Sequence, residues 1–104
     1  FSPVIPVQKV DSLDEAIQMS NATKYGLGCT IFTKDIERAM NAADKIKSGT
    51  VCINSPLMEN IAAPFGGMKQ SGIGREHGID ALDEFREAKH IYIDYEHNKK
   101  SWWF

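Results

Sequence analysis

The order of strand-like and helix-like segments constrains the fold of this chain more than any other feature. Apolar, β-branched runs at residues 4–10, 29–32 and 50–54 predict strands, because such residues suit the pleated backbone. Between these runs lie two segments whose apolar residues recur at helical spacing. Strands that alternate with helices over short links favour an α/β arrangement, in which crossover helices cover a sheet.

The two predicted helices carry signals for their boundaries. Ser12 and Glu15 have the three-residue spacing of a capping box, so a helix is expected to begin there. Thr33 or Asp35 can cap the second helix, and Gly49 is expected to end it. The apolar face predicted for this second helix consists of Ile36, Ala39, Met40, Ala43 and Ile46.

The chain changes character after the third predicted strand. Residues 55–74 contain Pro and Gly with little periodicity, and a loop of this length in a compact domain is usually functional or disordered. Its apolar residues argue against disorder. A third helix is predicted over residues 75–87, and the alternating residues 90–95 predict a last strand. The third helix is expected to turn inward Ile79, Leu82 and Phe85.

Composition excludes several classes of partner. The formal net charge of −2 over 104 residues offers no basic field for nucleic acid, and no apolar run approaches the roughly 18 residues of a membrane span. Cys29 and Cys52 match no metal or redox motif, and the three histidines are scattered, so no metal site is expected. We interpret the cysteines as buried thiols in a reducing, cytoplasmic compartment, with a disulfide between them left open.

The segment "PFGGMKQSGIGRE", residues 64–76, could be a phosphate cradle, a structural loop or part of a substrate pocket. A P-loop requires Ser or Thr after its lysine, but Gln follows Lys69. A dinucleotide-binding fingerprint would need glycine where His77 stands, and it would follow a strand directly. Tight turns and close backbone packing explain most of the glycines, but not the position of Phe65 beside them.

This segment closely resembles the PFGGxKxSGxGRE pattern of the NAD(P)-dependent aldehyde dehydrogenases. The opening "FSPVIPV" resembles that family's FGPVxPV, with Ser2 where glycine is usual, and residues 15–54 resemble its EAIxxAN…YGL…FTxD…GxVxxN block. Only the last nine residues, "EHNKKSWWF", are undiagnostic. The first residue is Phe rather than Met, so we expect the chain to be the C-terminal piece of a longer polypeptide.

The resemblance implies an α/β fold: residues 1–88 form the C-terminal part of the catalytic domain, and residues 89–104 an oligomerisation strand and tail. It also implies oxidation of an aldehyde to a carboxylic acid with NAD or NADP, through attack by a cysteine thiolate and hydrolysis of a thioester with a glutamate base. The family's nucleophile, base and cofactor domain all precede the matching region. No catalytic residue is therefore expected in this chain, and neither cysteine is the nucleophile.

A few roles follow from the resemblance residue by residue. Phe1 is expected to contact the cofactor, Phe65 to line the aldehyde tunnel, and Leu57 and Glu59 to lie near the substrate at its mouth. Arg75 and Glu76 are expected to brace the loop against the third helix by hydrogen bonds. The strand over residues 90–95 would join a sheet in a neighbouring subunit of a homo-oligomer. The alternative hypothesis is a stand-alone, non-catalytic fragment that acts as an assembly or binding module.

Overall fold

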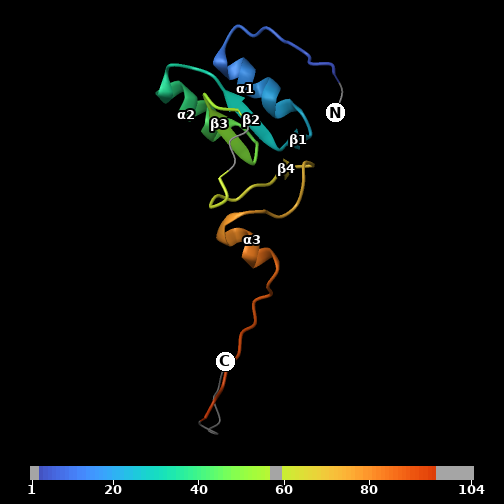
Figure 1. Ribbon diagram of the computed structural model, residues 1–104, viewed down its shortest axis with the longest axis vertical. Helices are drawn as coiled ribbons and strands as arrows, with labels where there is room; N and C mark the ends of the chain where they lie inside the picture. The colour runs from blue at the N-terminus through green and yellow to red at the C-terminus, as the bar shows by residue number, and fades with distance from the viewer. Residues whose placement is uncertain (1–2, 57–59, 96–104) are drawn as a thin grey trace, which may run out of the picture.

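The computed structural model of the chain describes residues 3–56 and 60–95 (Figure 1). In chain order its elements are α1 (Leu13–Ala22), β1 (Tyr25–Gly26), β2 (Gly28–Ile31), α2 (Ile36–Lys45), β3 (Thr50–Ile53), β4 (Met68–Lys69) and α3 (Gly78–Glu84). The predicted α/β class is confirmed. None of the helices in the described ranges has the length and apolar character needed to cross a membrane.

A parallel pair of strands forms the centre of the fold. β2 pairs with β3 in a register that runs from Gly28 opposite Thr50 to Ile31 opposite Ile53, and α2 is the crossover between them. Both strands lie within one residue of the bounds predicted from their β-branched composition. α1 and α2 lie beside this pair, whereas α3 and the residues after it extend away from it (Figure 1).

A second, shorter pair was not predicted. β1 and β4 are antiparallel, with Tyr25 opposite Lys69 and Gly26 opposite Met68. Because β1 immediately precedes β2, this pairing fastens the glycine-rich segment to the edge of the central layer. Two-residue strands carry almost no periodicity, so the sequence pattern could not reveal them.

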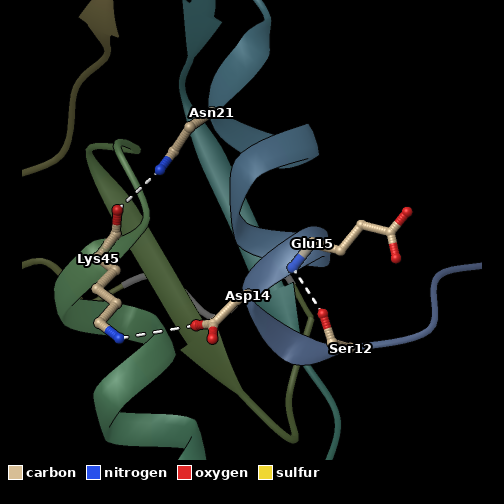
Figure 2. Close-up of polar contacts among 5 residues, drawn as sticks. All are labelled: Ser12, Asp14, Glu15, Asn21 and Lys45. Atoms are coloured by element: carbon tan, nitrogen blue, oxygen red, sulfur yellow. Dashed lines mark hydrogen bonds and ion pairs between the residues drawn. The ribbon is translucent and has the colours of Figure 1, made fainter.

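The start of α1 follows the predicted capping box. The Ser12 hydroxyl accepts a hydrogen bond from the backbone N–H of Glu15 at 3.1 Å (Figure 2), and the Glu15 carboxylate accepts one from the N–H of Asp11 at 2.8 Å. These bonds satisfy backbone donors that a helix start leaves without partners.

One amide joins the two helices. The Asn21 side chain donates from Nδ2 to the carbonyl of Lys45 at 2.9 Å (Figure 2), and its Oδ1 accepts from the N–H of Lys47 at 2.8 Å. The end of α1 is thereby fixed against the end of α2. The ion pair between Lys45 and Asp14, at 3.9 Å, is exposed and adds little.

The predicted boundaries of α2 are partly correct. Asp35, one of the two proposed caps, accepts from the N–H of Arg38 at 3.0 Å. The helix ends at Lys45 with Ile46 as its cap, so the prediction that Gly49 ends it was wrong. The apolar face is also rotated: its buried members are Ala39 and Ala42. The predicted inward residues Ile36 and Met40 are 64% and 58% exposed.

The predicted strands at residues 4–10 and 90–95 do not form in this structure, and the third helix spans only Gly78–Glu84. A strand forms only in a ladder with a neighbouring strand, and neither segment belongs to one of the two strand pairs of the described residues. The expected inward face of α3 is instead exposed, with fractions of 72%, 61% and 90% for Ile79, Leu82 and Phe85.

The overall dimensions show how little of the apolar surface is covered. The radius of gyration is 21.7 Å, against about 13 Å for a compact domain of this length. The accessible surface of 9676 Å² exceeds by roughly two-thirds the area typical of a folded monomer of this mass. Among the described residues, the only buried hydrophobic side chains are Ile17, Ala39 and Ala42.

Candidate functional site

The glycine-rich segment is a closed loop whose two ends are paired. Phe65 and Glu76 form an antiparallel bridge, in which each backbone N–H donates to the other residue's carbonyl at 2.7 Å. Ten residues, 66–75, therefore lie between two backbone positions that are held side by side. This pairing fixes the backbone of Phe65, and so the direction in which its ring leaves the loop.

Arg75 braces the loop internally, through bonds to the loop's own backbone, whereas the prediction was a brace against the third helix. Its Nη1 donates to the carbonyls of Gly67 at 3.0 Å and Gly74 at 2.7 Å. A Cβ on Gly66 would lie 2.6 Å from the carbonyl oxygen of Gly74, so the two sides of the loop approach too closely for any other residue. The Arg75 side chain therefore binds the backbone of the loop, whereas the side chain of Glu76 is exposed.

Three further contacts fasten the loop to the central layer. The Lys69 ammonium donates to the carbonyl of Thr23 at 2.9 Å, just beyond the end of α1, where a positive charge is favourable. The backbone N–H of Gln70 donates to Lys24 O at 3.0 Å, and the Ser71 hydroxyl accepts from the N–H of Gly26 at 2.8 Å. The loop therefore behaves as part of the scaffold.

Phe65 lies on the wall of a hollow of about 640 Å³. The ring is half-buried, and the opposite walls come from the loop itself, from Leu27 and from α3. The lining mixes apolar side chains with the charged groups of Arg75, Glu76 and Glu84. Such a cavity, apolar with a few polar groups, suits a small organic molecule.

The Cys29 thiol does not have the environment of a nucleophile. Burial raises the pKa of the Cys29 thiol above 9.0, although a hydrogen bond with Ser20 opposes this. Cys29 and Cys52 are both free. Since Cys29 aligns with Val51 and Thr30 with Cys52, the two thiols lie on opposite faces of the β2–β3 pair, which excludes a disulfide without rearrangement.

The described residues do not fit a dinucleotide. A phosphate cradle needs free backbone N–H groups, but those of Gln70 and Ser71 bond to Lys24 and Met68. The Gly67 and Gly74 carbonyls, which would repel a phosphate, face the Arg75 guanidinium. The prediction that this segment is no phosphate cradle agrees with these contacts.

A model described as the aldehyde dehydrogenase family matches residues 1–91. The chain belongs to this family. It is 45% identical over 94 residues to "Aldehyde dehydrogenase [NAD(P)+] 1" of Saccharomyces cerevisiae, which covers 90% of this chain and 19% of that protein. It is also 42% identical over 97 residues to "Mitochondrial 10-formyltetrahydrofolate dehydrogenase" of Mus musculus, covering 91% of this chain and 10% of that one.

Solved aldehyde dehydrogenases share the structure of this chain. Betaine aldehyde dehydrogenase from Staphylococcus aureus, in complex with NAD+, superposes with a TM-score of 0.90 at 42% identity, over 97% of this chain and 20% of that one. An NAD+ complex of an aldehyde dehydrogenase from Bacillus cereus superposes with a TM-score of 0.87 at 46% identity. The match covers 92% of this chain and 20% of that one. The chain thus spans about a tenth to a fifth of the length of the relatives it matches.

Of the four residues predicted to contact cofactor or substrate, the structure describes one. Phe65 lies on the wall of the hollow, whereas Phe1, Leu57 and Glu59 lie outside the described residues. Sequence reasoning had not selected His77, which lines the hollow beside Phe65. It had appeared only as the residue that breaks a glycine fingerprint, and nothing in the local pattern indicated that its ring faces Phe65.

Proposed function

We propose that this chain is the C-terminal part of an enzyme that oxidises an aldehyde to a carboxylic acid with NAD or NADP. In this proposal the cysteine nucleophile and the glutamate base belong to residues that precede Phe1. Membership of the aldehyde dehydrogenase family and the raised pKa of the Cys29 thiol support this division of roles.

The observation that carries the proposal is the position of Phe65. Paired backbone bonds to Glu76 and the Arg75 brace hold the ring on the wall of an open hollow. A ring fixed in this way excludes water and contacts the apolar part of an aldehyde, while the reacting carbonyl meets the nucleophile elsewhere. Leu57 and Glu59 are proposed as further substrate contacts, and Phe1 as a contact of the cofactor.

The test is the rate at which the full-length protein reduces NAD+ or NADP+ in the presence of short and long aliphatic aldehydes. Replacing Phe65 by Ala removes buried apolar contact, so kcat/KM for the long aldehydes is expected to fall about ten- to a hundredfold. Phe65→Leu keeps much of that contact, so its kcat/KM for the long aldehydes should fall less.

Phe32→Ala is the matched control, because Phe32 is 69% exposed and lines no part of this hollow. It should leave kcat/KM near the wild-type value. Equal losses in Phe65→Ala and Phe32→Ala would argue against a substrate contact. Activity of the isolated 104-residue chain would show that our assignment of the missing groups is wrong.

We also propose that residues 90–95 add as a strand to a neighbouring subunit of a homo-oligomer. The segment is extended, and its alternating side chains are exposed in this structure. Ile93→Pro removes a backbone donor from such a ladder, and it should lower the mass measured by light scattering. Lys89→Pro, outside the strand, should leave the mass unchanged.

For the location, we propose the cytoplasm, because both cysteines are free thiols and a reducing compartment keeps them so. Fractionation of cells that carry the tagged full-length protein tests this. Recovery with the mitochondria, where one relative's name places it, would contradict it.

A further inference from the structure

Phe65 and His77 form a side-chain pair between two hollows. Their ring centroids lie 6.1 Å apart with planes tilted by 33°, a separation typical of interacting rings. Besides the hollow of about 640 Å³, a second one of about 210 Å³ lies between β3 and the segment from Asn60 to Phe65. In the part of the chain that the structure describes, only Phe65 and His77 line both.

The backbone at His77 is held in a conformation that few side chains adopt. Its φ of 64° and ψ of 164° lie in a region that essentially only glycine adopts without strain. The residues on either side are fixed, Glu76 by its bridge to Phe65 and Gly78 by a bond from its N–H to Ile61 O at 3.0 Å. These two contacts hold the backbone of His77 in its strained conformation beside Phe65.

One ring nitrogen of His77, Nδ1, is buried without a hydrogen bond in the described part of the chain. An unpaired buried nitrogen costs stability, so a methyl or phenyl group would fill the same space at lower cost. Backbone strain and an unpaired nitrogen both count against histidine as a mere space filler, and features of this kind cluster at functional sites.

We propose that His77 is a positioning residue that holds the Phe65 ring as the wall between the two hollows, and thereby limits the size of the aldehyde. This inference rests on the proposed function. Without the imidazole, the Phe65 ring can turn toward the smaller hollow beside Thr50 and Cys52, and the larger hollow gains room. The kcat/KM for large aldehydes should then rise relative to that for small ones.

The variant that isolates the ring is His77→Asn, because Asn carries a Cβ as His does and so meets similar backbone strain, but it has no ring. In the full-length protein, the ratio of kcat/KM for a branched or aromatic aldehyde to that for a short linear one should rise about tenfold. His77→Phe restores a ring beside Phe65 and should return the ratio toward the wild-type value. Melting temperatures of all variants report any general loss of stability.

A double-mutant cycle decides whether His77 acts through Phe65. In a Phe65→Leu background, His77→Asn should change the selectivity ratio little, because the ring that it positions is already gone. An unchanged ratio in His77→Asn alone, or an equal effect in both backgrounds, would overturn the inference while leaving the proposed function intact. A wild-type protein that oxidises no aldehyde would overturn the proposed function, and this inference with it.

Discussion

The guanidinium of Arg75 lies inside the glycine-rich loop and holds its two sides together by hydrogen bonds. Its motif predicted a brace against the third helix, but its bonds go to two carbonyls on opposite sides of the loop itself. That Phe65 lines an aldehyde tunnel stays a prediction; the structure places it on the wall of a hollow. The contact with His77 was not predictable, because it depends on a backbone conformation that the chain adopts only after the loop has closed.

Replacing Arg75 by Met should destabilise the full-length protein by about 1.5–3 kcal/mol, since bonds to a charged donor are lost and a buried carbonyl is left unpaired. Arg86→Met is the matched control, because the pairing of Arg86 with Asp83 is exposed. Urea unfolding of both variants measures the difference. Equal stability of the two would mean that the Arg75 contacts contribute nothing.

The thiol of Cys29 gives a prediction about pH. Because burial raises its pKa, the folded protein keeps the proton at pH values where an unfolded thiol has begun to lose it. Its contribution to stability is therefore complete below the ordinary value of 9.0 and is lost as the pH rises through the higher folded value. Alkylation of Cys29 just below pH 9.0, followed by mass spectrometry, should be slower in native than in urea-unfolded protein; equal rates would contradict this.

At the scale of elements, local chemistry determined some features and tertiary contacts the others. The positions of β2 and β3 and the N-caps of α1 and α2 agree with the sequence-based predictions, because they depend on neighbouring residues. β1 and β4 depend on a pairing across more than forty residues, which no local pattern encodes. The end of α2 was misjudged because Gly49 has another role: a Cβ there would lie 1.6 Å from the carbonyl oxygen of Gly66.

This contact predicts different outcomes for two glycines. Gly49→Ala forces the segment before β3 away from the Phe65 loop, so we expect a loss of several kcal/mol and weaker binding of the aldehyde. Gly28→Ala, at the start of β2, meets no atom within 4 Å and should be nearly neutral. Melting temperatures compare the stability of the two variants, and KM values for the aldehyde compare their binding. A Gly49→Ala protein as stable as Gly28→Ala would show that the approach is not required.

For the whole molecule, the described chain exposes more apolar surface than a self-sufficient domain does. The faces that sequence periodicity assigned to a core, above all those of α2 and α3, are open to solvent. Among the described residues, the side of α2 that is buried is the one with Ala39 and Ala42, and the predicted inward residues of α3 are all exposed. In the proposed enzyme, the preceding part of the polypeptide covers these exposed faces and brings the nucleophile opposite Phe65.

The most direct measurement is a crystal structure of the full-length protein with an unreactive amide analogue of a long-chain aldehyde. The account predicts that the Phe65 ring lies within about 4 Å of the analogue's carbon chain, with Arg75 still bonded to Gly67 and Gly74. A ligand bound elsewhere, with the Phe65 ring packed only against protein, would contradict it.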